Sequence, residues 1–536
     1  MRRLVPISAL LAAAAAAFVA GGSAQSAQPV PGEAVFVVSG RGWGHGVGMS
    51  QYGAYGMANE GKTYEEILTY FYTGTEIGRT PRKAVRVLLA EGRRAVTIFS
   101  AARFKVVDAV GTVTPIAAGP LVLRADLTLP TPAGPVEPVG PVSVRAGKAP
   151  LALDGQLYRG SFEVTVQGSL LRIVNKLPIE DYLQGVVAGE MPHTWPLEAL
   201  KAQAVAARSY ALANLVKGKP FDLYADQRSQ VYGGIAGEKS RTTEAVRSTA
   251  GRVVLYGDRI ASTYYFSSSG GKTASSEDVF GFAVPYLVSK PDPWDRASPN
   301  HRWGPVLLGA RTVQAKLGLE SRVLDATGVP TPSGRLRAVT LQTLDGTSSV
   351  PAVLLRTTFA LRSTWMSIGV LRLDRPAGTV VFGSSVRLSG VARGLESPTL
   401  SASATGSTWA PVGALIRGSD GAVSLSLKPS RTMRYRIESK EAASPGQLLR
   451  VAPRVRLAVP ADPGALSGTV RPKLPGAVVT IERRKGTVWA GVADAVVDGA
   501  GSFRAQLQLL AGGYRARVAA TDGYAEGLSP MIMVSG

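Results

Sequence analysis

The sequence predicts an α+β fold, in which a mixed domain of helices and strands is followed by all-β modules of the sandwich type. Three observations predict it. Residues 178–216 carry two helical patterns, and the segments on either side show the short, turn-bounded patterns of strands. From about residue 374 to residue 536 we find only strand and turn patterns. The length of 536 residues exceeds one domain of roughly 100–200 residues, so we expect three or four compact units.

The region before the two helices is predicted to begin with a buried strand. Ala34–Val38 is apolar and is followed by a glycine-rich loop, residues 40–48. Helices are predicted for residues 50–57 and 64–72, because apolar side chains in the second segment recur at i, i+3, i+4 and i+7. Residues 82–175 read as short strands joined by Pro/Gly turns.

The two central helices have recognisable ends. Pro178 suits the first position of one helix, which Gly189-Glu-Met-Pro192 interrupts. The next helix is predicted from Thr194 or Trp195 to about Val216, with alanines on its buried face. Further extended segments are predicted at residues 252–256, 260–266 and 335–373.

These patterns divide the chain into the following predicted parts: a signal peptide at 1–27, a glycine-rich segment at 28–80, a β-rich insert at 81–145, a core domain at 146–373, a β-rich module at 374–455 and a sandwich-like module at 456–536.

The N-terminus has the layout of a secretory signal peptide. Arg2 and Arg3 precede a short alanine-rich apolar stretch at residues 7–20, and small residues follow up to Ala27. The apolar stretch is shorter than the roughly 20 residues that span a membrane. We therefore expect export, with an uncleaved membrane anchor as the alternative.

Composition narrows the chemistry. The chain has no cysteine, which excludes thiolate metal sites and cysteine nucleophiles. Its formal net charge of +22 predicts affinity for anionic surfaces such as cell-wall polymers. No long basic run or base-reading motif with interleaved aromatics occurs, so nucleic acid is not an expected partner.

Two segments carry candidate chemistry. His45 stands in Gly42-Trp-Gly-His-Gly-Val-Gly-Met-Ser-Gln51, where glycines allow close approach of the backbone to a ligand. His45 is therefore a candidate for contact with substrate, and a purely structural histidine is the alternative. His193 and His301 are weaker candidates. The G-x-S-x-G, H-E-x-x-H, Walker and Rossmann patterns do not occur.

Glu190 is the carboxylate of greatest interest. It is predicted at the carboxyl end of a helix, where the helix dipole disfavours negative charge, and apolar neighbours would add desolvation. Both effects favour the protonated form that a general acid needs. The alternative is an ordinary surface glutamate. A glycosidase of the usual kind needs a second carboxylate, and spacing singles out none of Asp226, Asp278 and Asp292.

One stretch of the chain resembles a known family. Residues 177–213, with Gly189-Glu-Met-Pro192 and Glu198-Ala-Leu-Lys-Ala-Gln-Ala-Val-Ala-Ala-Arg208, closely resemble the stage II sporulation protein D (SpoIID/LytB) family. Further matching motifs are Ser229-Gln-Val-Tyr-Gly233, Ser268-Ser-Gly-Gly-Lys-Thr273, Glu277-Asp-Val279, Pro285-Tyr-Leu287 and Leu361-Arg-Ser-Thr-Trp365. The segment Gly42–Ala54 resembles the family's other signature, which here comes first, as if the domain were circularly permuted.

The resemblance implies a SpoIID-like catalytic domain acting on peptidoglycan glycan strands. The family contains lytic transglycosylases, which cleave between N-acetylmuramic acid and N-acetylglucosamine, and proteins that enhance wall amidases. The family's catalytic glutamate falls on Glu190. A lone glutamate suits transglycosylation, because the 6-hydroxyl of muramic acid can attack the anomeric carbon.

The resemblance also implies a cleft and its partners. The expected partners are glycan strands, anionic wall polymers and, for a non-catalytic member, a wall amidase. Some relatives hold zinc near the segment that matches residues 267–271, but this chain has serines there, so neither a metal nor a cofactor is expected. The substrate-binding residues that we predict are His45, Ser50, Gln51, Gln203, Arg208, Ser229, Gln230, Tyr232, Ser268, Thr273 and Asp278.

Overall fold

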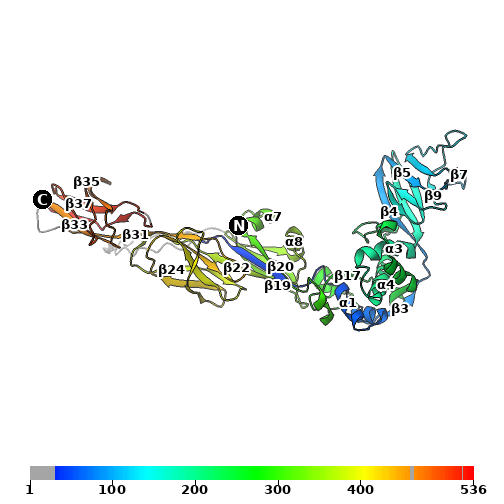
Figure 1. Cartoon of the computed structure of the whole chain (residues 1–536), viewed down its shortest axis with the longest axis horizontal. Coiled ribbons are helices and arrows are strands. Elements are labelled where there is room, and N and C mark those ends of the chain that lie inside the picture. The colour runs from blue at the N-terminus through cyan, green and yellow to red at the C-terminus, as the bar shows by residue number, and fades with distance from the viewer. Residues whose placement is uncertain (1–29, 459–463, 522, 536) are drawn as a thin grey trace, which may run out of the picture. The chain divides into compact units, whose positions relative to one another are not determined.

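The computed structural model describes residues 30–458, 464–521 and 523–535, so the predicted signal peptide at 1–27 lies outside the described residues. The chain divides into two compact units (Figure 1). The first, Val35–Val370, is called the mixed unit below. The second joins the residues up to Ala34 with Leu371–Gly536 and is called the β unit.

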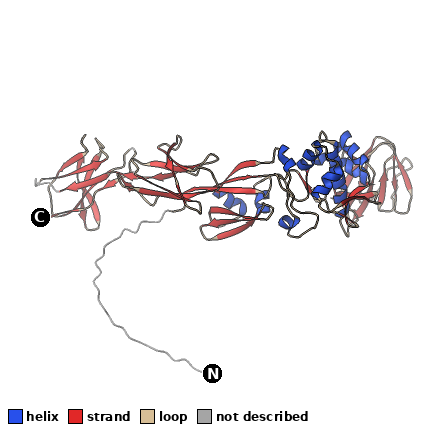
Figure 2. Cartoon of the chain, turned by 90° about the horizontal axis from the view of Figure 1, so that it is seen from below, coloured by secondary structure: helices blue, strands red, loops and turns tan. Residues whose placement is uncertain are grey.

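The described helices belong to the mixed unit, whereas the β unit is drawn with strands and loops (Figure 2). The helices are α1 (Gln51–Asn59), α2 (Tyr64–Phe71), α3 (Ile179–Glu190), α4 (Leu197–Ala213), α5 (Ser240–Ser248), α6 (Ser276–Phe280), α7 (Ala310–Leu317) and α8 (Ala352–Thr358), with short 3-10 turns η1 (Gly234–Gly237) and η2 (Pro293–Ala297). The predicted combination of helices and strands is confirmed.

The strands of the mixed unit are β1 (Val35–Gly40), β2 (Met49–Ser50), β3 (Glu76–Arg79), β4 (Ala84–Arg93), β5 (Ala95–Ser100), β6 (Phe104–Val107), β7 (Val113–Ile116), β8 (Gly119–Arg124), β9 (Val142–Arg145), β10 (Leu151–Leu153), β11 (Gln156–Tyr158), β12 (Ser161–Gln167), β13 (Leu170–Pro178), β14 (Leu223–Tyr224), β15 (Arg252–Tyr256), β16 (Arg259–Ile260), β17 (Tyr265–Phe266), β18 (Trp303–Gly309), β19 (Val323–Pro330), β20 (Leu336–Thr343), β21 (Thr347–Pro351) and the start of β22 (Met366–Leu373).

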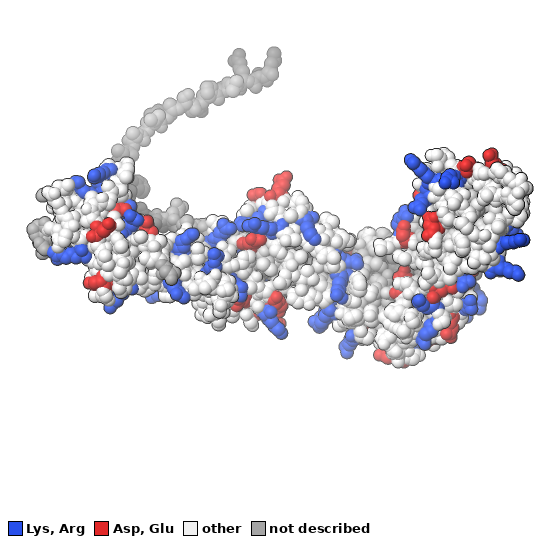
Figure 3. Space-filling model, turned by 45° about the horizontal axis from the view of Figure 1, so that its top comes forward, with Lys and Arg blue, Asp and Glu red and all other residues white. Residues whose placement is uncertain are grey.

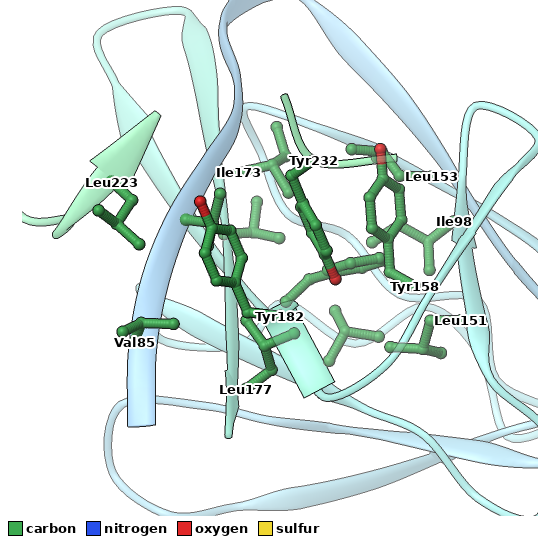
Figure 4. Close-up of a cluster of buried hydrophobic side chains, with 14 of the residues drawn as sticks. Val85, Ile98, Leu151, Leu153, Tyr158, Ile173, Leu177, Tyr182, Leu223 and Tyr232 are labelled. Carbon is green, nitrogen blue, oxygen red and sulfur yellow. The ribbon is translucent and has the colours of Figure 1, made fainter. Parts of the chain in front are cut away.

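A seven-stranded sheet positions the two central helices. Its strand order is β14-β4-β13-β12-β9-β6-β7, and β13 runs directly into α3. Alternate side chains of these strands point inward with those of α3 to form one buried cluster, which includes Val85, Ile173 and Tyr182 (Figure 4). Burial of apolar surface stabilises a fold by about 25 cal/mol per Å². The cluster therefore fixes where α3 begins and which face of α3 packs against the sheet.

The helices α3 and α4 lie close to their predicted positions. Pro178 caps α3 instead of starting it, and Pro196 does the same for α4. Helix α4 ends at Ala213, three residues before the predicted end at Val216. Its alanines at 204, 206 and 207 are fully buried, which lets the helix pack closely against its neighbours.

Four helices were not anticipated, α5, α6, α7 and α8. Helix α5 has a polar sequence with only Ala245 and Val246 as adjacent buried apolar residues, so no helical periodicity marks it. Helix α7 is similarly polar. The interpretation of residues 335–373 as mainly extended is wrong for Ala352–Thr358, which forms α8. Such short helices are stabilised by tertiary packing rather than by their own propensity.

The β unit holds two separate buried clusters of apolar side chains. One lies within residues 371–449 and the other within 455–518, and no helix occurs in the described part of this unit. Its strands are β23 (Val380–Val381), β24 (Val386–Arg393), β25 (Thr399–Ser403), β26 (Ala410–Ala414), β27 (Ile416–Arg417), β28 (Ala422–Leu427), β29 (Met433–Glu438), β30 (Gln447–Leu449), β31 (Val451–Ala452), β32 (Arg454–Ala458), β33 (Ala465–Arg471), β34 (Val478–Lys485), β35 (Val488–Val496), β36 (Ser502–Gln506), β37 (Gly512–Val518), β38 (Gly527–Leu528) and β39 (Ile532–Val534).

The positive charge is dispersed. On the face shown in Figure 3, Lys and Arg side chains occur over both units and are not gathered into one patch. Among the residues placed by the structure, no helix has the length and apolarity needed to cross a membrane.

Candidate functional site

Glu190 is the last residue of α3 and is partly buried. No basic residue lies in the last turn of α3, so nothing on the helix offsets the negative end of its dipole. Burial raises the pKa of Glu190 above its ordinary value, and a hydrogen bond from Tyr265 opposes the shift in part. The carboxyl group is therefore held toward the protonated state that the sequence predicted.

Three tyrosines surround this carboxyl group. Burial is the largest cause of the raised pKa of Tyr182, Tyr210 and Tyr265, and the Glu190 carboxylate raises each pKa further. Tyr182 comes from α3, Tyr210 from α4 and Tyr265 from β17. The site is thus assembled where two helices meet a strand (Figure 1).

A buried glutamine ties two of these tyrosines together. The amide nitrogen of Gln230 donates to the Tyr265 hydroxyl at 3.0 Å and to the carbonyl of Ala207 at 3.3 Å. The Tyr182 hydroxyl donates to the Gln230 side-chain oxygen at 3.2 Å. Gln230 is only 3% exposed, so it supports the groups around Glu190 rather than forming an open surface for substrate.

The glycine-rich loop reaches the same place. The side chain of Gln51, at the start of α1, donates to the backbone carbonyl of Glu190 at 3.0 Å. The loop also forms bridges to residues 268 and 274, and β2 pairs with β17 in parallel. The N-terminal segment and Glu190 are therefore neighbours in the folded mixed unit.

The glycines of this loop allow its backbone to lie close to other parts of the protein, and not to a ligand. Gly42, Gly44, Gly46 and Gly48 all have positive φ. A Cβ atom on Gly48 would lie 2.1 Å from the carbonyl oxygen of Tyr264, and one on Gly46 would lie 2.5 Å from the Arg335 guanidinium. The expectation that these glycines face a ligand is therefore corrected, because the backbone around Tyr264 occupies that space.

His45 uses both ring nitrogens within the protein. Its Nδ1 accepts from the backbone N–H of Val47 at 3.0 Å, and its Nε2 lies 3.1 Å from the carbonyl oxygen of Tyr265, to which it donates. Burial lowers the pKa of His45 to about 4, so the ring is neutral at neutral pH. Tyr265 contacts His45 through its backbone and Glu190 through its hydroxyl.

Replacing His45 with Ala is expected to lower stability by about 1–3 kcal/mol, because two backbone groups of the loop lose their partners. The pKa below 6.5 means that His45 favours the folded state above that pH and that this contribution is lost as pH falls toward 4. Thermal unfolding at pH 7 measures the effect, with exposed His193→Ala as the matched control. Lost activity at an unchanged melting temperature would instead give His45 a direct role with substrate.

Two predicted residues meet at a neighbouring buried carboxylate, that of Asp295. It accepts hydrogen bonds from the hydroxyls of Ser268 at 2.9 Å and Ser50 at 3.3 Å. It also accepts from two backbone N–H groups of residues 269 and 270 at 2.8 Å, and it pairs with His301 Nδ1 at 3.0 Å. Ser50 and Ser268 are at most 1% exposed, so they join α1 to the loop at 267–271 and do not line an open cleft.

Arg208 and Gln203 do not face solvent either. Arg208 is fully buried and forms two bonds to the Glu180 carboxylate, at 2.5 and 3.0 Å. Its remaining contacts are with the carbonyls of Arg252 and Val246. Gln203 is also fully buried and accepts from Gln51 at 3.4 Å. Direct contact with a glycan, which we expected of both residues, does not fit these positions.

Four further predicted residues form hydrogen bonds within the mixed unit. The Ser229 hydroxyl accepts from the N–H of Tyr224, and the Tyr232 hydroxyl donates to Asn175. Buried Thr273 accepts from the N–H of Lys290, and Asp278 accepts from the N–H of Ser333. Of these four, Thr273 and Tyr232 are nearly inaccessible, and the hydrogen bonds described for the four do not reach Glu190.

Of the three aspartates considered as a second catalytic carboxylate, two are bonded to other protein groups and the third is fully buried. Asp226 forms an ion pair with Arg228 at 2.7 Å, which lowers the pKa of Asp226 to about 2. Asp278 holds the loop around Ser333. Asp292 is fully buried, and burial raises its pKa to about 7. Within the described part of the chain, no charged carboxylate contributes to the pKa shift of Glu190.

The segment 267–271 does not fit a zinc ion. Its side chains are serine hydroxyls, which are not the thiolate, imidazole or carboxylate ligands that zinc prefers. The Ser268 hydroxyl already donates to Asp295. Across the residues that the structure describes, no group of three or more His, Asp or Glu side chains is arranged to hold a metal ion.

Sequence reasoning missed Tyr265 and Asp295, which organise the site and its neighbour. Tyr265 lies in a short strand of Ser-Thr-Tyr-Tyr-Phe, where nothing distinguishes it from packing aromatics. Partly exposed His301 and buried Asp295 are six positions apart, and this spacing matches no motif. Tyr265 comes next to Glu190 only in the folded chain, where its hydroxyl bonds to that carboxyl group.

Comparison with known proteins identifies the segment that carries Glu190. Residues 167–256 match the SpoIID family, described as stage II sporulation protein. The SpoIID segment therefore includes α3, α4 and Glu190. It does not reach the glycine-rich loop, so the suggested N-terminal family signature stays a prediction.

Several curated proteins are similar to this chain over part of its length. A stage II sporulation protein D of Bacillus subtilis is 36% identical over 164 residues, covering 27% of this chain and 48% of that protein. An amidase enhancer of Bacillus subtilis is 39% identical over 179 residues, covering 33% of this chain and 23% of that protein. An uncharacterized protein of Brachyspira hyodysenteriae is 42% identical over 138 residues, covering 25% of this chain and 38% of that protein. The chain thus spans less than half the length of each of these relatives.

Proposed function

We propose that this chain is an exported, wall-associated lytic transglycosylase that cleaves peptidoglycan glycan strands between N-acetylmuramic acid and N-acetylglucosamine. The observation that carries the proposal is the setting of Glu190. Its carboxyl group is kept toward the protonated state by burial, and no second carboxylate shares in that shift among the described residues. A single acid of this kind suits a reaction in which the substrate supplies its own nucleophile.

The chemistry follows from that single carboxyl group. Protonated Glu190 donates its proton to the oxygen that bridges the two sugars, and the bond to the anomeric carbon of muramic acid breaks. The resulting Glu190 carboxylate then takes the proton of the muramic 6-hydroxyl as that oxygen attacks the anomeric carbon. The products are a 1,6-anhydromuramic end and a new non-reducing N-acetylglucosamine end, and Glu190 is protonated again.

A cluster of aromatic side chains on α1 and on the segment after α3 suits a sugar ring. Trp195 lies on the segment between α3 and α4, and its ring centre is 4.9 Å from those of Tyr52 and Tyr55 on α1. All three are partly exposed. Such rings present flat apolar faces with polar edges, which match the two faces of a pyranose.

A second candidate is a non-catalytic protein that binds glycan and stimulates a wall amidase. The observation in its favour is the similarity to the relative named amidase enhancer. The two candidates differ in one measurable property. The enzyme shortens purified glycan strands by itself, whereas the enhancer leaves them intact and accelerates release of stem peptides when a wall amidase is added.

Replacing Tyr265 with Phe is expected to shift the pH dependence of cleavage. The Tyr265 hydroxyl lowers the pKa of Glu190, so its removal raises that pKa further. Since a general acid acts in its protonated form, the decline of kcat/KM at high pH moves to higher pH. Initial rates across pH measure this, with Tyr256→Phe, an exposed tyrosine on β15, as the control. A decline at the wild-type pH in Tyr265→Phe would contradict the role of Tyr265 in setting the acid.

A further inference from the structure

A pocket of about 490 Å³ lies at the opposite end of the glycine-rich loop from Gln51. It is built where the end of β1 and the starts of β18 and β22 come together. Arg41, Arg302, Trp303 and Trp365 provide its larger side chains, and the serines at 39 and 367 provide hydroxyls. The described residues that line it include no Asp or Glu.

Arg41 is held in place at this pocket. Its backbone N–H donates to the carbonyl of Trp365 at 2.8 Å, and its carbonyl accepts from the Ser363 hydroxyl at 2.5 Å. Its guanidinium lies over the Trp365 ring, 5.5 Å from the ring centre. No carboxylate of the described chain pairs with Arg41 or Arg302.

Trp303 forms a rigid wall of the pocket. Trp303 is 8% exposed, and its indole N–H is buried without a hydrogen-bond partner in the described structure. The ring is fixed there, since a Cβ atom on Gly40 would lie 2.3 Å from it. The pocket therefore offers the guanidinium groups of Arg41 and Arg302 beside two tryptophan rings and has no acidic side chain to accept from them.

We infer that this pocket binds the carboxylate of a muramic acid residue of the glycan. Arginine forks match planar oxyanions through paired, charge-assisted hydrogen bonds. A pocket of several hundred Å³ accommodates a saccharide unit. The identity of this ligand rests on the proposed function, since muramic acid is the carboxylate-bearing sugar of the proposed substrate. Two groups of the glycan can supply this carboxylate. One is the lactyl group of a muramic acid residue without a stem peptide, and the other is the stem peptide itself.

Titration calorimetry with the full chain carrying Glu190→Gln tests the inference without turnover. The probes are a tetrasaccharide of alternating N-acetylglucosamine and N-acetylmuramic acid without stem peptides, the same tetrasaccharide with stem peptides, and chitotetraose, which has no carboxylate. We expect one of the muramic probes to bind about 10- to 100-fold tighter than chitotetraose. This ratio of dissociation constants corresponds to the free energy of one or two charge-assisted hydrogen bonds. Tighter binding of the first probe assigns the lactyl carboxylate, and tighter binding of the second assigns the stem peptide.

The advantage over chitotetraose should disappear when Arg41→Gln or Arg302→Gln is added. Arg302 is exposed, so its replacement leaves the fold intact even where Arg41→Gln disturbs the loop. The matched control is Arg337→Gln, which removes one exposed charge on β20 of the same unit. Equal binding of all probes, or an equal loss with Arg337→Gln, would overturn the inference even if the wild-type chain cleaves glycan. If the chain binds the muramic probes more tightly than chitotetraose but does not cleave glycan, the pocket assignment stands and only the proposed transglycosylase activity is overturned.

Discussion

Replacing Glu190 with Gln is expected to reduce glycan cleavage by about 10²–10⁴-fold, the usual contribution of an essential acid–base group. Glutamine has nearly the shape of protonated glutamic acid but has no proton that it can transfer. Its amide can still accept from the Tyr265 hydroxyl that now bonds to Glu190. The loss should therefore fall on kcat, with the affinity for glycan nearly unchanged.

The same substitution should not weaken the fold. Because burial raises the pKa of Glu190, the folded chain holds the proton more tightly than the unfolded chain, and stability is lost as pH rises from 4.5 through the raised pKa. Glutamine removes that loss, so the melting temperature of Glu190→Gln at pH 7 should equal or exceed that of the wild type. The control is Glu244→Gln, an exposed glutamate on α5. A loss of activity of only a few-fold would contradict the role of Glu190 as the acid.

Replacing Arg208 with Ala is expected to destabilise the mixed unit by about 3–5 kcal/mol, the cost of removing one partner of a buried ion pair. The change leaves the partly buried Glu180 carboxylate with only the Gly251 N–H as its remaining partner from this network. It also leaves the carbonyls of Arg252 and Val246 without their donor. Denaturant unfolding measures the loss directly.

Two further variants distinguish a structural role of Arg208 from a role in glycan binding. Arg208→Lys keeps the charge but not the fork that reaches Glu180 and two carbonyls, so a smaller loss of stability is expected. The double variant Glu180→Gln with Arg208→Met removes both charges and should be less destabilised than Arg208→Ala. If Arg208→Ala melted like the wild type yet failed to bind glycan, the structural role assigned here would be wrong and the role expected from the resemblance would stand.

The parts of the fold that were predictable are those with strong local patterns. The helices around Glu190 have long apolar faces and proline or glycine at their ends, so their bounds were predicted within three residues. The C-terminal β pattern was equally clear, because no helical periodicity competes with it. Helix α5 could not be found, since its nine residues are mostly polar and its stability depends on packing against α3 and α4.

The candidate acid Glu190 was predictable from the sequence, but the residues that surround it were not. The direction of the pKa shift of Glu190 was expected from its position, and burial of the carboxyl group is the largest cause of that shift. The motif residues Gln203 and Arg208 were taken for substrate contacts. A sequence motif does not distinguish a side chain that binds substrate from one that holds two helices together, and burial decides between them here.

Digestion of purified glycan strands without stem peptides decides whether this chain is a lytic transglycosylase. The wild-type chain is incubated with the strands, and the new ends are identified by mass spectrometry, with Glu190→Gln run in parallel. We expect 1,6-anhydromuramic ends, 18 Da lighter than reducing ends because no water is added, and none with Glu190→Gln. Reducing muramic ends would instead show hydrolysis with a second catalytic group, and intact strands would show that the chain binds glycan without cleaving it.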